Sequence, residues 1–274
     1  MRNIIETYKN KWFSRQNELQ EVSQLEINFL KSVFSHLIFI QFDKLALELM
    51  DLIASNPYYS DLLSVELILY SMKSVSRLEL FNKMDILRLK FMNYSFELKK
   101  MKLKKLLDIL EIYTIICLWY NDISLFAEIF QGELKVARPA LFDINNQKKL
   151  PIKSYIEILI FNVKLYNTAS KLQSENNHVL SSIIENKRSV KLSMSLLKMM
   201  NKVDVHIRHS LIQNLTDCYI SLLDVHIRAG LSRDTDYYIK EITKIVDSLQ
   251  DPPIILGCLH AIQNYYFITK MDSL

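Results

Sequence analysis

Glycine is scarce in this sequence of 274 residues, which contains only three glycines (Gly132, Gly230 and Gly257) and five prolines. Glycine allows a backbone to approach a phosphate closely or to turn at positive φ. Its scarcity therefore argues against P-loops, dinucleotide-binding folds and hairpin-rich architectures. Half of the residues are apolar, and they recur at the spacing of amphipathic helices. The composition predicts an all-α protein.

Cysteine is also rare, and charge of one sign is not in large excess. The three cysteines, Cys117, Cys218 and Cys258, lie far apart among apolar neighbours, which is typical of reduced thiols in a core. The net charge of +4 requires no polyanionic partner. The N-terminus lacks the apolar segment of a secretory signal, and the most apolar stretch, 106–120, is too short and too charged to cross a membrane. We expect a cytoplasmic protein without a membrane span.

Groups that could support catalysis are missing from the sequence. His206 and His209 share a helix face, but they lack the glutamate and the third ligand of a zinc hydrolase. No Gly-x-Ser-x-Gly or comparable context for a nucleophile occurs. The sequence therefore predicts a binding or scaffolding protein that is not an enzyme and that needs no metal or other cofactor.

Capping residues and prolines divide the chain into helices, because Ser, Asp and Asn satisfy free N–H groups at a helix start and proline cannot continue a helix. Turns are expected at Asn56–Pro57, at Asn121–Asp122, over 143–149, at Gly230 and over 251–253. The expected helices are 61–74, 76–93, 97–120, 122–131, a further helix to 142, 151–172, 177–185, 190–200, 204–229, 234–250 and 253–269. Joined by short loops, they predict antiparallel helix pairs with the pitch of tetratricopeptide-like repeats.

Three segments of the sequence resemble one family of regulators. Residues 119–126, Trp-Tyr-Asn-Asp-Ile-Ser-Leu-Phe, resemble a Trp-x-x-(Tyr/Asp)-x-x-Leu-Phe segment in the regulatory domain of Rgg/GadR/MutR-type transcription regulators. Residues 156–162 resemble that family's Ile-x-x-Asn segment, and 242–266 resemble its closing helices. The resemblance implies a right-handed tetratricopeptide-like superhelix that forms a homodimer. It also implies a short hydrophobic signalling peptide in the concave groove, in transcriptional or quorum-sensing control.

Members of that family begin with a helix-turn-helix DNA-binding domain, and a shorter segment occupies this position here. Val22-Ser23-Gln24-Leu25-Glu26 resembles the Ser-x-x-Glu of the recognition region. We therefore expect residues 1–40 to be a truncated remnant of this domain and residues 41–274 to be the regulatory domain. Ser23 and Gln24 are the candidate DNA contacts. Lys99, Lys100 and Lys102 belong to the densest basic run, which could contact phosphates or form a solvated helix start.

A peptide groove needs side-chain amides, a cation and apolar pockets. Asn162 is the candidate amide, and helical spacing places Tyr155 and Tyr166 on its face. Arg88 and Arg138 are the candidate cations. Trp119, the first residue of the 119–126 segment, is a further candidate for peptide binding. Alternatively, Asn162 caps a neighbouring helix and each arginine forms an internal ion pair.

Two other functions stay open at this point. The chain could be a DNA-binding regulator with a degenerate helix-turn-helix, in which the lysine run assists residues 1–40. It could instead be a helical scaffold without a small ligand, whose groove is filled by its own side chains or by a protein partner. Steep salt dependence of DNA binding would favour the first of these.

Overall fold

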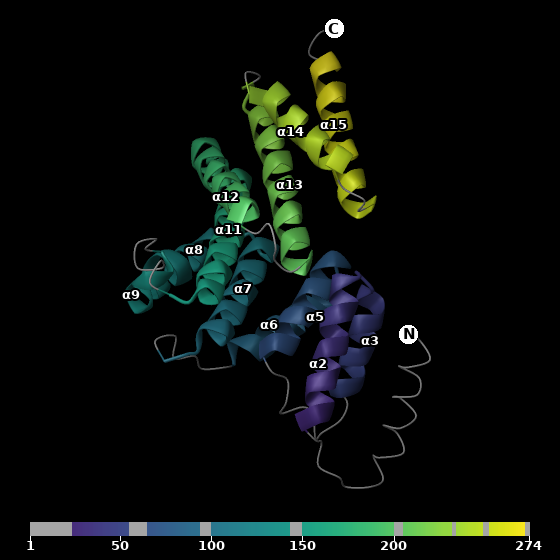
Figure 1. Cartoon of the computed structure of the whole chain (residues 1–274), viewed down its shortest axis with the longest axis vertical. Helices are drawn as coiled ribbons and strands as arrows, with labels where there is room; N and C mark the ends of the chain where they lie inside the picture. The colour runs from purple at the N-terminus through teal and green to yellow at the C-terminus, as the bar shows by residue number, and fades with distance from the viewer. Residues whose placement is uncertain are drawn as a thin grey trace. The chain divides into compact units, whose positions relative to one another are not determined.

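The computed structural model describes residues 24–54, 65–93, 100–142, 150–199, 205–231, 234–248 and 252–271. These residues are almost entirely helical and contain no strand (Figure 1). The predicted all-α class with antiparallel helix pairs is thereby confirmed. The chain forms two compact units, Met1–Trp119 and Tyr120–Leu274. The proposed division after residue 40 stays a prediction, and so does the cytoplasmic location. Among the described helices, none combines the length and apolar character that a membrane span requires.

The first unit is built around helix α5. Its described helices are α2 (Gln24–Phe39), α3 (Asp43–Ala54), α5 (Val65–Arg77), α6 (Phe81–Met92) and α7 (Leu103–Trp119). Helices α2, α3 and α5 enclose a core that includes Phe34, Leu37 and Met50. Helix α5 also packs against α6 and α7.

The second unit begins with four short segments and continues with five long helices. The short segments are α8 (Ile123–Phe126), a π-helical turn η1 (Ala127–Glu133), α9 (Leu134–Ala137) and a 3₁₀ turn η2 (Pro139–Leu141). The long helices are α11 (Ile152–Glu175), α12 (Val179–Met199), α13 (Val205–Arg228), α14 (Thr235–Ser248) and α15 (Pro252–Met271). Helix α13 packs against all four of the other long helices.

Small hydroxyl side chains allow α11 and α12 to pack closely along their length. Ser170 Oγ lies 2.9 Å from both the carbonyl oxygen and the hydroxyl of Ser182. Ser189 Oγ donates to the carbonyl oxygen of Val163 at 2.9 Å. These serines are fully buried, so their hydrogen bonds avoid the cost of burying an unpaired hydroxyl.

Left-handed residues end several helices in a chain that has few glycines. Gln41, Glu79, Asn177 and Gly230 have φ between 54° and 67° and follow α2, α5, α11 and α13. In each case the next residue's N–H returns to a carbonyl five residues earlier, as from Leu80 to Val75 and from His178 to Gln173. This is the Schellman arrangement, which normally uses glycine. The chain therefore makes these turns with only one of its glycines.

Several predicted helix boundaries are wrong. Helix α5 continues through Ser76 and ends at Arg77, and the turn forms at Glu79. The predicted helices 177–185 and 190–200 form the single helix α12. Gly132 lies inside the π-helical turn and does not end a helix. The predicted turn at Asn121–Asp122 is confirmed, because Asn121 has a φ of 49° and the Asp122 carboxylate accepts the Leu125 N–H. The expected turns at 56–57 and 143–149 lie outside the described residues.

Candidate functional site

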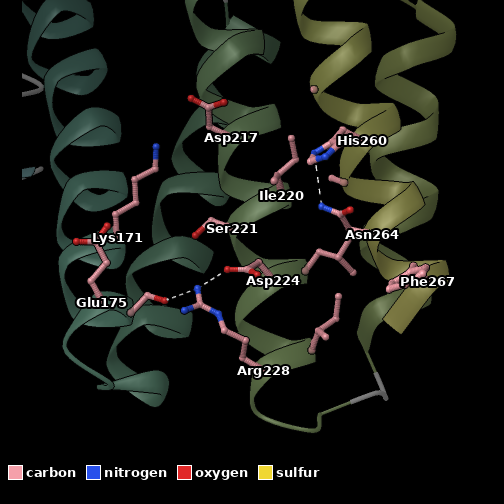
Figure 2. Close-up of a pocket in the computed structure, with 15 residues that line it drawn as sticks. Lys171, Glu175, Asp217, Ile220, Ser221, Asp224, Arg228, His260, Asn264 and Phe267 are labelled. Atoms are coloured by element: carbon pink, nitrogen blue, oxygen red, sulfur yellow. Dashed lines mark hydrogen bonds and ion pairs between the residues drawn. The ribbon is translucent and has the colours of Figure 1, made fainter. Parts of the chain in front are cut away.

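A groove of ≈ 500 Å³ lies in the second unit between α11, α13 and α15 (Figure 2). Helical spacing explains why its polar residues face one another. Asp217, Ser221, Asp224 and Arg228 recur every three or four residues and therefore share one face of α13. The same periodicity places Lys171, Ser174 and Glu175 on α11 and His260, Asn264 and Phe267 on α15.

One end of the groove contains a paired cation. The guanidinium of Arg228 forms an ion pair with Asp224, one turn earlier on α13. Its Nη2 also donates to Ser174 Oγ at 3.0 Å. Figure 2 shows Arg228 beside Asp224, with a dashed line between the two side chains. The positive charge of Arg228 is therefore already compensated within the protein.

The other end of the groove contains a carboxylate, Asp217, that lacks a hydrogen-bond donor among the described side chains. Asp217 is partly buried and receives no hydrogen bond from any residue in the described part of the chain. Burial raises the pKa of Asp217, and the positive charge of Lys171 opposes this shift without cancelling it. Burial raises the pKa of Cys258 on α15, and the negative charge of Asp217 adds to this shift. The carboxylate therefore lies within electrostatic reach of both neighbouring helices.

Apolar and neutral polar groups separate the two ends. Ile220, Ile227 and Phe267 supply apolar surface. Ser221 Oγ accepts a hydrogen bond from Asn186 Nδ2 at 3.0 Å, and Asn264 lies 3.5 Å from His260 Nδ1. Such a mixture of apolar surface and spaced polar groups suits the binding of a polypeptide segment.

Two cysteines of this unit, Cys218 and Cys258, are buried. Burial raises the pKa of Cys218 to about 12 and that of Cys258 to about 11, so neither thiol ionises near neutral pH. Within the described ranges, no three His, Cys, Asp or Glu side chains gather as a metal site would require. The absence of an enzymatic role and of cofactors stays a prediction.

Asn162 does not face the groove. Its side chain is 5% exposed, and its Nδ2 donates to the carbonyl oxygens of Leu141 at 3.0 Å and of Ile158 at 3.1 Å. The amide therefore ties the end of η2 to the middle of α11. This contact corresponds to the alternative interpretation of Asn162, in which it satisfies a neighbouring helical segment.

The two tyrosines predicted beside Asn162 are half-buried. Tyr155 packs against the core cluster around Leu159, Leu196 and Leu211. Tyr166 has a raised pKa because of burial and, secondarily, the negative charge of Glu185. Neither tyrosine lines the groove.

The remaining peptide-site candidates are divided between the two units. Arg88 is half-buried on α6, and Trp119 ends α7 with its ring 5.0 Å from that of Phe81. Both residues belong to the first unit, whereas Arg138, Tyr155, Asn162 and Tyr166 belong to the second. Arg138 is half-buried between α9 and η2. None of these candidates lines the groove, and a peptide site built from them stays a prediction.

The candidate nucleic-acid contacts lie in the first unit. Ser23 and Lys99 lie outside the described residues, and Gln24 is the first residue of α2. Lys100 and Lys102 are exposed just before α7.

Sequence reasoning missed the groove residues. A signal was present, because residues 217, 220, 221, 224, 227 and 228 form a polar and apolar stripe at helical spacing. The same pattern is typical of an ordinary solvated helix face. Only the approach of α11 and α15 turns this stripe into the wall of a groove.

Comparison with known proteins identifies one strong likeness. No protein-family model matches the chain. Separin of Saccharomyces cerevisiae is 33% identical over 281 residues, which cover 99% of this chain and 17% of separin. Two crystal structures of the Saccharomyces cerevisiae separase-securin complex match with a TM-score of 0.80 at 30% identity, covering 99% of this chain and 18% of the matched chain. The chain therefore spans less than a fifth of the length of the proteins it matches.

These matches overturn the resemblance to Rgg/GadR/MutR-type regulators. That resemblance rested on spaced apolar and aromatic residues such as those of 119–126, which helical arrays of many kinds share. The predicted role in transcription and quorum sensing is therefore wrong. The predicted partners, a signalling peptide and a second copy of the chain, are corrected too, because the matched structures contain separase with a different protein, securin. The DNA-binding alternative loses its basis with the family. Over 99% of its own length, the chain is therefore similar to a portion of separase.

Proposed function

We propose that this chain is a helical, protein-binding segment of a separase-like protein and that its partner is a securin-type protein. The observation that carries the proposal is the match over 99% of the chain, at a TM-score of 0.80, to separase in the separase-securin complex. At 30% identity this match concerns both sequence and fold, so it supports more than a shared architecture.

The character of the groove supports binding over chemistry. Its walls combine fixed ion-pairing groups, such as Arg228 and Asp224, with the apolar surface of Ile220 and Phe267. Interfaces between proteins combine the same elements: apolar contacts, charged groups and hydrogen-bonding side chains. We therefore propose that the chain contributes a binding surface and no catalytic group. This corresponds to the protein-scaffold alternative that the sequence left open.

A direct binding measurement tests this function. The 274-residue chain is titrated into fluorescently labelled securin of Saccharomyces cerevisiae, and fluorescence anisotropy is recorded. We expect saturable binding with a dissociation constant of about 1 μM or tighter, equivalent to about −8 kcal/mol. An unrelated unfolded protein of the same length and net charge serves as the control. Equal anisotropy changes for securin and for this control, or no saturation with securin, would contradict the proposed function.

A further inference from the structure

We propose, building on the protein-binding role above, that the groove between α11, α13 and α15 holds an extended partner segment whose lysine or arginine side chain pairs with Asp217. Asp217 lies on α13 at the end of the groove opposite to Arg228 (Figure 2). The site and the chemistry of its occupant follow from four features of the groove.

The first feature is the charge that remains after internal pairing. The groove contains three carboxylates, Glu175, Asp217 and Asp224, but only two fixed cations, Lys171 and Arg228. Arg228 is occupied by Asp224 and Ser174. One carboxylate is therefore in excess, and an occupant with a single positive charge neutralises the groove. Lys171 is the remaining cation of the groove, and the two carboxylates Glu175 and Asp217 outnumber it, so an anionic occupant would meet net negative charge there.

The second feature is the state of the Asp217 carboxylate. It is partly withdrawn from water, and no donor in the described part of the chain satisfies its oxygens. A desolvated carboxylate gains most from a donor that also carries charge, because such hydrogen bonds are stronger than neutral ones. The raised pKa of Asp217 agrees with a carboxylate that Lys171 stabilises only in part.

The third feature is the size of the groove. A volume of ≈ 500 Å³ lies within the range of about 300–1,000 Å³ that is typical of small-ligand sites. It admits a few side chains and excludes a folded domain, so the occupant is an extended segment.

The fourth feature is the apolar surface next to Asp217. Ile220 lies three residues further along α13, and Phe267, which is 64% exposed, lies across the groove on α15. Successive side chains of an extended segment point in opposite directions. A basic residue that reaches Asp217 can therefore be followed, two residues later, by an apolar residue that covers Ile220, and residues further along the segment can reach Phe267.

The test uses two pools of nine-residue peptides that differ only in whether the central side chain carries a positive charge. Both pools have random apolar residues on either side of a fixed central residue, which is arginine in one pool and its neutral analogue citrulline in the other. The full 274-residue chain is immobilised, and retained peptides are quantified by mass spectrometry. We expect the chain to retain the arginine pool about tenfold more than the citrulline pool, which corresponds to about 1.4 kcal/mol.

Matched variants assign this preference to one carboxylate. We expect Asp217→Asn, which keeps the shape of the side chain, to abolish the preference for arginine. Asp247→Asn makes the same change at an exposed carboxylate of α14 that does not line the groove, and we expect it to keep the preference. Circular dichroism melting confirms that each variant is folded. Equal retention of both pools by the unmodified chain, or an unchanged preference in Asp217→Asn, would overturn the proposal.

The outcome also separates this site from the proposed function. If securin does not bind but the arginine preference depends on Asp217, the site stands and the securin-type partner is wrong. If securin binds equally tightly to the unmodified chain and to Asp217→Asn, and the two pools are retained equally, the function stands and the site is wrong.

Discussion

The guanidinium of Arg77 holds the carboxylate of Asp43 with two hydrogen bonds, from Nε at 2.8 Å and from Nη2 at 2.5 Å. Nη2 also donates to the carbonyl oxygen of Ile38 at 3.3 Å. The last residue of α5 thereby fixes the start of α3 and the end of α2. Because the Asp43 side chain is only 8% exposed, it depends on this partner for its solvation.

Removal of Arg77 is therefore predicted to destabilise the first unit. We expect Arg77→Ala to lower the free energy of unfolding by about 2–3 kcal/mol, because it leaves a buried carboxylate unpaired. Urea denaturation followed by circular dichroism measures the change. Lys83 and Asp51 provide a matched control, since they form an ion pair at 2.7 Å between exposed side chains. Lys83→Ala should cost less than about 1 kcal/mol, and a cost equal to that of Arg77→Ala would contradict the role of burial.

The buried amide of Asn162 is predicted to be structural. Asn162→Ala removes the donor to the Leu141 carbonyl oxygen. We expect it to lower the free energy of unfolding by about 1–3 kcal/mol, measured by thermal or urea melting. Asn264→Ala is the control, because this amide is exposed in the groove, and its cost should be within about 0.5 kcal/mol. Similar costs for the two variants would contradict the structural role of Asn162.

Ionised Asp217 is predicted to cost stability. Burial raises its folded-state pKa above the ordinary value of 3.8, so the native state binds a proton more readily than the unfolded chain does. Asp217 therefore favours the folded state at a pH below its pKa in the unfolded chain. This contribution to the free energy of unfolding is lost as the pH rises through its pKa in the folded chain. We expect Asp217→Asn to raise the melting temperature at pH 7 and to lose this advantage as the pH falls to about 4. A lower melting temperature at pH 7 would contradict the prediction.

The cysteines of the second unit are predicted to be unreactive in the folded protein. Cys218 and Cys258 are fully buried, and their pKa values are raised to about 12 and about 11. The thiolate is the reactive form, so a disulfide reagent such as 5,5′-dithiobis(2-nitrobenzoic acid) should label them at pH 8 only after unfolding. Labelling kinetics with and without urea measure this protection. Rapid labelling of either residue in the folded chain would be inconsistent with its burial.

Two glycines are predicted to respond to alanine with opposite signs. Gly230 has a φ of 67°, and no atom lies within 4 Å of the position that an added methyl group would take, so only the backbone opposes the substitution. We expect Gly230→Ala to cost about 1 kcal/mol in unfolding free energy. Gly257 is helical with the same free space, and Gly257→Ala should gain about 0.5–1 kcal/mol. Chemical denaturation of both variants checks the difference in sign.

The helical class could be predicted because periodicity and the lack of glycine both exclude the alternatives. Individual turns were harder to predict. Asn121 and Asp122 are typical turn residues, and the turn is where they indicate it. Glu79 is not typical of the left-handed region, so nothing in the local sequence places a helix end there. Tertiary packing of α5 and α6 decides this boundary.

The site could not be predicted to the same degree, because a helix face does not reveal its neighbour. The stripe with Tyr155 and Asn162 is real, but its tyrosine packs against a core cluster and its amide holds η2. The groove requires Lys171, Asp217 and His260 from three helices that are far apart in the sequence. No spacing rule within one helix anticipates such a meeting.

The π-helical turn between α8 and α9 can absorb a change of one residue in the length of the sequence. A π-helix has a wider turn than an α-helix, so it accommodates an additional residue without displacing the segments on either side. In this chain the turn covers Ala127–Glu133 and keeps Phe130 buried, with its ring 4.8 Å from that of Phe126. A related sequence that is one residue shorter here can form a continuous α-helix with the same two ends. The segment is thus a place where the chain tolerates a single insertion or deletion at little structural cost.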